Sequence, residues 1–241
     1  MIGLKTRLEN SSEEMLKELQ SFPQINCIVH LAAMTLVKDC QSQPEKAYAL
    51  NVEGASKWFM AAHQAGIRHF ILASTSHVYG NPHTEQPIST KHPLNPVSVY
   101  GQTKVAAEIQ LSDLARNFPQ MKLTIARLFS VISKESKPGL LYTNLHRRAR
   151  EKDFSPIPGL HYVRDFIPVD DVVDRLIRLA SWQNAPPIVH ISSGKGRRVL
   201  DLAAEVFLEY GLDAQKLLNE APQEPNDIPW IVGEPTIIPD S

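Results

Sequence analysis

Tyr100 and Lys104 are the two residues whose types and spacing point most directly to chemistry. They stand four residues apart in the run Ser98-Val-Tyr-Gly-Gln-Thr-Lys104, and a helix would place both on one face. A free tyrosine loses its proton at about pH 10, and a neighbouring ammonium group favours the phenolate and lowers the tyrosine pKa. The pair suits a general base or acid in the oxidation of a carbinol to a ketone. The same spacing also occurs in exposed pairs that lie over a core.

Thr75 is placed to assist such a pair. It ends the short apolar run Phe70-Ile-Leu-Ala-Ser-Thr75, which is typical of a buried strand. A threonine at the carboxyl end of a parallel strand faces the crevice in which such sheets hold ligands. Its hydroxyl would then bind the oxygen atom whose proton Tyr100 takes, or it would only cap a turn.

Six blocks of sequence extend this pattern over nearly the whole chain. They are Val29-His-Leu-Ala-Ala33, Asn51-Val-Glu-Gly54, Ser74-Thr-Ser-His-Val-Tyr-Gly80, Tyr100-x-x-x-Lys104, Arg127-Leu-Phe-Ser130 and Arg164-Asp-Phe-Ile-Pro-Val-Asp-Asp171. In type and order the blocks resemble the extended short-chain dehydrogenase/reductases, the family of NAD-dependent sugar-nucleotide epimerases and dehydratases. The resemblance implies a Rossmann-like, doubly wound parallel sheet. It also implies that hydride passes from a sugar carbon to bound NAD or NADP while Tyr100 takes the hydroxyl proton.

The resemblance assigns roles residue by residue. It implies that Thr75, Tyr100 and Lys104 are catalytic, with Lys104 also holding the nicotinamide ribose. The implied cofactor-binding residues are these two, Tyr100 and Lys104, together with Leu31, Ala32, Ala33, Ser74 and Phe129. The implied substrate-binding residues are Ser76, His77, Ser130, Asn144 and Arg164.

Several of these positions have a purely structural alternative. Leu31, Ala32 and Ala33 would equally pack within a strand, and Asn51 would tie a helix to the sheet. Arg164 suits a diphosphate because its planar guanidinium binds phosphate oxygens bidentately, but it would also form a surface ion pair with Asp165 or Asp170. Ser130 stands where many family members carry a substrate-contacting asparagine.

The chain departs from the family at its glycines. The family opens with a strand, a Gly-x-x-Gly-x-x-Gly turn and a helix that holds the cofactor pyrophosphate, and none of the 11 glycines stand in that spacing. Ser193-Gly-Lys-Gly196 is the nearest match, and we interpret it as a strand-to-helix turn. Three hypotheses follow: an enzyme, a non-catalytic remnant that keeps the fold without the cofactor, or a fragment whose start lies upstream. The choice between NAD and NADP stays open.

Two further features narrow the chemistry. Sugar 4,6-dehydratases carry Asp-Glu directly after the Thr75 position, whereas this chain has Ser76 and His77, which argues against dehydration. The tail Glu224-Pro-Asn-Asp-Ile-Pro-Trp-Ile-Val-Gly233 is similar to a block of GDP-4-keto-6-deoxymannose reductases, with Glu224 in place of an arginine. We therefore expect epimerisation or keto-reduction of a nucleotide-diphosphate sugar.

Composition sets the remaining expectations. A formal charge of −1 in 241 residues gives no argument for nucleic acid, and two cysteines are too few for a disulfide framework or a metal centre. No apolar run reaches the roughly 18 residues that span a bilayer, so we expect a cytoplasmic enzyme that does not bind membranes. The family resemblance favours a homodimer formed by the helices at about 44–65 and 98–116.

Strands alternating with helices predict a doubly wound parallel sheet. We expect residues 1–131, with about 168–192, to form the cofactor-binding domain, and residues 132–167 and 193–241 to form an interleaved substrate lobe. The expected irregular loops are 81–97 and 153–168. The expected helices are 11–20, 44–65, 98–116, 138–150, 170–182 and 199–210, and the expected strands are 26–33, 69–74, 123–129 and 188–191.

Overall fold

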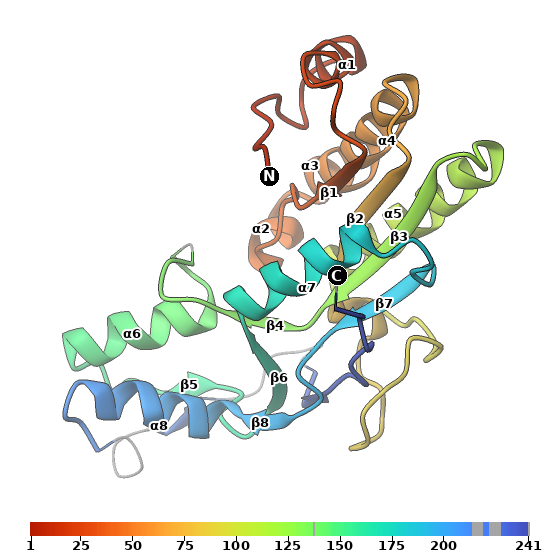
Figure 1. Cartoon of the computed structure of the whole chain (residues 1–241). Helices are drawn as coiled ribbons and strands as arrows, with labels where there is room; N and C mark the ends of the chain where they lie inside the picture. Colours follow the sequence, from red (N-terminus) through yellow and green to blue (C-terminus); the bar gives the residue numbers. More distant parts are fainter. Residues whose placement is uncertain (137, 214–218, 222–227, 241) are drawn as a thin grey trace.

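The computed structural model is an α/β structure built on a parallel sheet, and it describes residues 1–136, 138–213, 219–221 and 228–240 (Figure 1). The main sheet has the order β1-β2-β3-β7, and every neighbouring pair is parallel. This is the fold class that the sequence predicts. The strands are β1 (Cys27–His30), β2 (His69–Thr75), β3 (Lys122–Leu128) and β7 (Ile188–Ile191).

Helices connect these strands and cover both faces of the sheet. The 19-residue helix α5 is the longest of the described helices, and it carries Tyr100 and Lys104. The connecting elements are α1 (Ser12–Gln20), α2 (Val37–Ser42), α3 (Pro44–Tyr48), the π-helix η1 (Ala49–Gly54), α4 (Ala55–Gln64), the 3-10 turn η2 (Ser76–Tyr79), α5 (Val99–Asn117) and α7 (Val169–Ser181).

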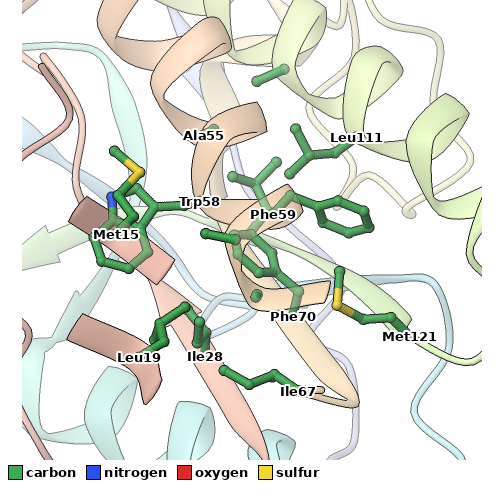
Figure 2. Close-up of a cluster of buried hydrophobic side chains, with 14 of the residues drawn as sticks. Met15, Leu19, Ile28, Ala55, Trp58, Phe59, Ile67, Phe70, Leu111 and Met121 are labelled. Atoms are coloured by element: carbon green, nitrogen blue, oxygen red, sulfur yellow. The ribbon is translucent and has the colours of Figure 1, made fainter. Parts of the chain in front are cut away.

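Alternate residues of β2 face the two layers of the core, as the pleat of a strand requires. Phe70 and Leu72 belong to the cluster between the sheet and α1, α4 and α5, whereas Ile71 belongs to the cluster under α7. Figure 2 shows the first cluster, in which aromatic and thioether side chains from separate elements meet. Its largest members include Met15, Trp58, Phe59, Phe70, Leu111 and Met121.

A second, smaller lobe lies beyond the carboxyl ends of the main strands (Figure 1). Its central strand β6 pairs with β4 and β10 in parallel and with β8 in antiparallel orientation. Helices α6 and α8 pack together over a cluster that includes Leu145, Leu202 and Phe207. The elements are β4 (Ser130–Ile132), α6 (Leu141–Glu151), β5 (Ile157–Pro158), β6 (Val163–Pro168), β8 (Gly196–Arg198), α8 (Val199–Glu209), β9 (Glu220–Ala221) and β10 (Trp230–Ile231).

The C-terminal segment returns from the smaller lobe to the main sheet. Gly233 forms a parallel bridge with Ile88 in the loop at 81–97. Further on, the Thr236 N–H donates to the His190 carbonyl oxygen at 3.3 Å, and Ile238 is buried in the cluster under α7. The segment therefore connects the two parts of the molecule. Glu224, which replaces the arginine of the reductase-like tail, lies outside the described residues.

Several expected elements differ in the structure. The strand expected at 26–33 ends at His30, and Leu31, Ala32 and Ala33 lie in the loop that follows β1. The single helix expected at 44–65 is divided into α3, η1 and α4, because the turns widen to the π-helical pattern at residues 49–54. The expected irregular loop at 153–168 contains β5 and the central strand β6. The hydrophobic pattern does not predict strand β6, because the strand carries the charged residues Arg164 and Asp165. Asp165 is nevertheless fully buried, and it accepts hydrogen bonds there.

None of the helices in the described ranges is long and apolar enough to span a membrane. Within the same ranges, no group of three His, Cys, Asp or Glu side chains is arranged to hold a metal ion. Cys27 and Cys40 are both free thiols.

Candidate active site

The first turn of α5 lies against the carboxyl edge of the main sheet. Ser98 caps the helix, with its side-chain oxygen accepting a hydrogen bond from the Gly101 N–H at 3.1 Å. Gly101 allows the helix to touch the η2 turn directly, since a Cβ atom at this position would lie only 2.7 Å from the His77 carbonyl oxygen. This close approach brings Tyr100 to Thr75 at the end of β2.

The Tyr100 phenol is protonated at neutral pH. Burial raises the pKa of Tyr100 to about 12, and the hydrogen bond with the Thr75 side chain opposes that shift. The sequence predicts a lowered pKa from the neighbouring ammonium group, so the net direction differs from the expectation. The reason is that a phenolate in a desolvated site loses more hydration energy than a nearby charge restores.

Lys104 lies one helical turn beyond Tyr100 and is 3% exposed. Burial lowers the pKa of Lys104 to about 8, and the Glu108 carboxylate, one further turn along α5, opposes this shift. The structure thus brings together the three residues predicted to be catalytic: Thr75, Tyr100 and Lys104.

His30 ends β1 beside these residues and leaves a polar atom unsatisfied. Its Nε2 is buried without a hydrogen-bond partner in the described part of the chain. Burial lowers the pKa of His30 to about 3, and the positive charge of Lys104 acts in the same direction, so the imidazole lies near the ammonium group. A buried donor or acceptor without a partner suits a hydroxyl-bearing ligand, and the ribose of a nicotinamide cofactor fits this description.

The loop after β1 begins with exposed residues and is fixed by hydrogen bonds from Asn51. Leu31 is 59% exposed, so it does not pack in the core as the structural alternative requires. Asn51 accepts a hydrogen bond from the Met34 N–H at 2.7 Å, and its Nδ2 donates to the Met34 carbonyl oxygen and the Thr103 hydroxyl. Asn51 therefore ties η1 to this loop and to α5. Ala32 is exposed and Ala33 is half-buried.

On the other side of Tyr100, the structure places His77 and Arg164 near each other. The His77 and Tyr100 rings meet edge to face, with 5.6 Å between their centroids. Burial lowers the pKa of His77 to about 4, with a contribution from the positive charge of Arg164. The Arg164 guanidinium lies over the Tyr162 ring at 5.2 Å. A neutral imidazole thus adjoins the phenol, and the positive charge of Arg164 acts on that imidazole.

The remaining predicted residues are spread more widely. Ser74 and Ser76 are buried, and the Ser74 hydroxyl donates to Glu108. Phe129 is also buried, with its ring pressed so closely on Gly233 that a Cβ atom there would lie 2.3 Å away. Ser130 is half-buried in β4, and Asn144 on α6 accepts hydrogen bonds from Arg147.

A buried polar network behind Lys104 includes residues that no sequence motif marks as functional. Glu108 accepts hydrogen bonds from Arg127 Nε at 3.1 Å and Nη2 at 2.6 Å. Arg127 also donates to the Tyr79 hydroxyl, which in turn contacts His190. Glu108 repeats the four-residue step from Tyr100 to Lys104, and that spacing is the signal by which it could have been found.

Asp165 has a structural role. Its carboxylate accepts hydrogen bonds from the Ser193 N–H at 2.7 Å, the Gly194 N–H at 2.9 Å and the Gly233 N–H at 3.3 Å. The Gly194 N–H, which a phosphate-binding loop would direct at its ligand, is therefore occupied. The segment Ser193–Lys195 connects β7 to the short strand β8, and β8 separates it from α8. It is therefore a connection between two strands and not the strand-to-helix turn that the sequence predicts.

The parallel sheet, with a tyrosine and a lysine at its carboxyl edge, defines a Rossmann-like α/β protein of the short-chain dehydrogenase/reductase class. The chain belongs to the NAD dependent epimerase/dehydratase family, whose model matches residues 6–192. The resemblance seen in the sequence motifs is thereby confirmed, and so is the NAD-dependent character of the family.

Curated relatives include UDP-glucose 4-epimerases. The Lactobacillus helveticus protein is 29% identical over 210 residues, covering 79% of this chain and 63% of the relative. The Dictyostelium discoideum protein is 26% identical over 213 residues, covering 79% of this chain and 62% of the relative. The matches thus span less than two thirds of these relatives' length.

Solved structures agree in fold. MoeE5 in complex with UDP-glucose and NAD superposes with a TM-score of 0.85 at 25% identity, covering 96% of this chain and 76% of that one. UDP-glucose 4-epimerase from Thermotoga maritima, solved with UDP-glucose, gives a TM-score of 0.82 at 24% identity and covers 97% and 75% of the two chains.

Proposed function

We propose that this chain carries out NAD(P)-dependent epimerisation or keto-reduction of a nucleotide-diphosphate sugar. The observation that carries the proposal is the arrangement of Thr75, Tyr100 and Lys104 at the carboxyl edge of the sheet. The Thr75 hydroxyl acts on the Tyr100 phenol as a hydrogen-bond partner, and Lys104 is buried one helical turn away. The UDP-glucose 4-epimerases among the relatives support a sugar-nucleotide substrate.

When bound, the nicotinamide supplies reversible hydride acceptance, and the residues of this chain handle the proton. Tyr100 Oη exchanges a proton with the reacting sugar hydroxyl, and the Thr75 hydroxyl holds the same oxygen. The positive charge of Lys104 favours the phenolate when Tyr100 acts as a base, and its ammonium group holds the cofactor ribose together with the unpaired Nε2 of His30. Leu31, Ala32 and Ala33, in the loop that follows β1, complete the proposed cofactor-binding residues beside His30.

We propose that the smaller lobe, residues 132–167 and 193–241, binds the nucleotide sugar. Arg164 is suited to the diphosphate because its planar fork binds two phosphate oxygens at once. The neutral His77 imidazole adjoins Tyr100 and is suited to a sugar hydroxyl. Ser76, Ser130 and Asn144 complete the proposed substrate side, and residues 1–131 with about 168–192 form the cofactor side.

The alternative is a chain that keeps the fold without binding the cofactor. It is favoured by the absence of a Gly-x-x-Gly-x-x-Gly turn from the 241 residues, since that turn holds the pyrophosphate in Rossmann folds. NADH binding separates the two functions. The enzyme proposal expects saturable binding near one NADH per chain, measured by fluorescence or calorimetry, whereas the alternative expects none at millimolar NADH.

Tyr100→Phe tests the chemistry itself. If the chain binds NADH, this variant should keep binding it while losing at least ~100-fold in turnover of a nucleotide sugar, because it removes only the proton-exchanging oxygen. Unchanged turnover in Tyr100→Phe would rule out the proposed mechanism.

We propose further that the chain forms a homodimer through α3 and α5. An open groove of about 500 Å³ lies between them, lined in part by Tyr48, Ala106, Ile109 and Leu114, and Ile109 is 57% exposed. Ile109→Glu should convert a dimer to a monomer in analytical ultracentrifugation, because a buried charge would oppose association. Ile177→Glu is the matched control, since Ile177 is similarly exposed on α7. Equal dissociation of both variants would contradict this interface.

A further inference from the structure

The Glu108 side chain is buried, and its carboxylate is fixed by three hydrogen bonds. It is 3% exposed, and it accepts hydrogen bonds from Ser74 Oγ at 2.5 Å and from two nitrogen atoms of Arg127. Its donors come from β2 and β3, while Glu108 itself lies on α5. Three elements of the fold therefore fix the carboxylate in one position.

The charges around Glu108 do not cancel. Arg127 is 3% exposed and pairs directly with Glu108. Lys104 is equally buried and lies one helical turn before Glu108 on α5, so the two side chains share one helix face, and the Glu108 carboxylate raises the Lys104 pKa. Two buried cations thus share one anion. A buried cation without compensation is strongly unfavourable, so the placement of the single carboxylate decides whether Lys104 keeps its proton.

Other titratable groups around the lysine do not supply this charge. His30, on β1, is neutral because burial holds its pKa at about 3. Tyr100, on α5, is a neutral phenol, because its pKa lies at about 12, and Cys40 of α2 acts on Tyr100. Burial together with the charge of Asp39 raises the pKa of Cys40, so this thiol is also neutral. Glu108 is the anion among these neighbours.

We propose that Glu108 is a positioning residue that acts through Lys104: its carboxylate, one helical turn away and fixed by Ser74 and Arg127, maintains the charge of the ammonium group at the active site. This inference deepens the proposed function and rests on it, because Lys104 matters only if Tyr100 exchanges protons. It also gives Ser74, whose hydroxyl donates to Glu108, a supporting role.

The hydrogen-bond network continues from Arg127 to Tyr79, which offers a control variant for the Glu108 experiment. Arg127 Nη1 donates to the Tyr79 hydroxyl at 2.7 Å, and this hydroxyl contacts His190 Nε2. His190 Nδ1 lies 3.1 Å from the Glu234 carbonyl oxygen. Tyr79 is fully buried, so Tyr79→Phe disturbs the same network without changing the charge beside Lys104.

The test is the pKa of Lys104 in the cofactor-free full chain, measured by NMR of the lysine Nζ groups, with the Lys104→Arg variant identifying the signal. Glu108→Gln should lower the Lys104 pKa by about one unit or more, because it removes an opposite charge at close range. Tyr79→Phe should lower the melting temperature and leave the Lys104 pKa unchanged. If Glu108→Gln does not fold, Glu108→Gln/Arg127→Gln is compared with Arg127→Gln, because these two variants differ only in the carboxylate. The Lys104 pKa should then be lower in the double variant than in Arg127→Gln.

The two levels of the proposal fail separately. An unchanged Lys104 pKa in folded Glu108→Gln, or equal Lys104 pKa values in Arg127→Gln and the double variant, would overturn the positioning role, even if Tyr100→Phe abolishes turnover. A lowered Lys104 pKa together with normal turnover in Tyr100→Phe would leave the electrostatic role of Glu108 intact and remove the proposed chemistry. A Lys104 pKa that falls equally in Tyr79→Phe would also overturn the inference, because any disturbance of the hydrogen-bond network would then lower the Lys104 pKa.

Discussion

At the scale of single residues, Thr75 is the partner that makes the Tyr100 phenol more acidic. Burial raises the pKa of Tyr100 to about 12, and the hydrogen bond with Thr75 acts in the opposite direction. Thr75 Oγ1 also accepts a hydrogen bond from the His77 N–H at 3.3 Å, so its position is fixed by the turn that follows. The hydroxyl therefore orients the phenol and stabilises its charged form.

Thr75→Val should reduce turnover of a nucleotide sugar about 10- to 100-fold, because the isosteric side chain keeps the packing and removes the hydroxyl. The Tyr100 pKa should rise further, because the hydrogen bond that opposes the effect of burial is lost. Tyr100 should therefore form less phenolate in Thr75→Val than in the wild-type chain at the same alkaline pH, as measured by phenolate absorbance with Thr75→Val/Tyr100→Phe as the blank. Thr75→Ser keeps the hydroxyl and should retain most of the activity. Equal activity of Thr75→Val and Thr75→Ser would show that the hydroxyl plays no part.

Spacing in the sequence was enough to predict that Thr75, Tyr100 and Lys104 meet, because two are on one helix face and the third ends a strand at the ligand-binding edge of the sheet. It was not enough to predict their ionisation. The pKa of Tyr100 depends on how deeply the folded chain buries the phenol. The carboxylate of Glu108, on α5, is held by Arg127, which lies 19 residues further along the chain on β3. Burial and long-range pairing are properties of the packed structure.

At the scale of secondary-structure elements, the contact between α5 and the η2 turn determines where Tyr100 lies. Gly101 is the residue at that contact, and Pro96 also approaches it. Gly101→Ala would place a methyl group 2.7 Å from the His77 carbonyl oxygen, so the helix has to move away from the turn. A displacement of about 1 Å at a reacting group costs about 100-fold in rate, and overpacking costs about 1–3 kcal/mol of stability.

We therefore expect Gly101→Ala to lose roughly 100-fold in turnover and to unfold at a lower temperature, measured by steady-state kinetics and circular dichroism. Gly3→Ala is the matched control, because no atom lies within 4 Å of the added methyl group at that position. A fully active Gly101→Ala would mean that the position of α5 is not critical for the site.

Element prediction succeeded where hydrophobic periodicity dominates and failed where polar residues are built into a strand. The continuous apolar run of β2 marks it as a buried strand in the sequence, whereas β6 carries the charged pair Arg164 and Asp165 in its centre. Only the folded chain supplies the donors that make the buried Asp165 carboxylate tolerable. The π-helix η1 carries Asn51, which bonds the Met34 backbone 17 residues earlier, and π-helical turns often mark functional sites.

At the scale of the whole molecule, buried neutral histidines predict how stability depends on pH. Burial lowers the pKa of His30 to about 3 and those of His69 and His190 to about 4. In the unfolded chain a histidine titrates near pH 6.5. Below that pH the unfolded state binds more protons than the folded state, so stability falls as pH falls from about 6.5 to 4.

The expected slope is up to ~1.4 kcal/mol per pH unit for each of these histidines, measured as the free energy of unfolding in urea. His190→Gln should reduce the slope, because its amide can replace the contacts of His190 to Tyr79 and Glu234 without a titrating group. A free energy that stays constant between pH 6.5 and 4 would contradict the burial of neutral histidines.

The return of the C-terminal segment to the main sheet has a consequence for biosynthesis. Thr236 and Ile238 complete the surroundings of His190 and the cluster under α7, although most of that cluster is made much earlier. A ribosome adds about 5–20 residues per second, so the earlier strands wait with this face uncovered until translation has passed Ile238. Nascent chains of this protein should therefore remain substrates for chaperones until Ile238 has left the ribosome.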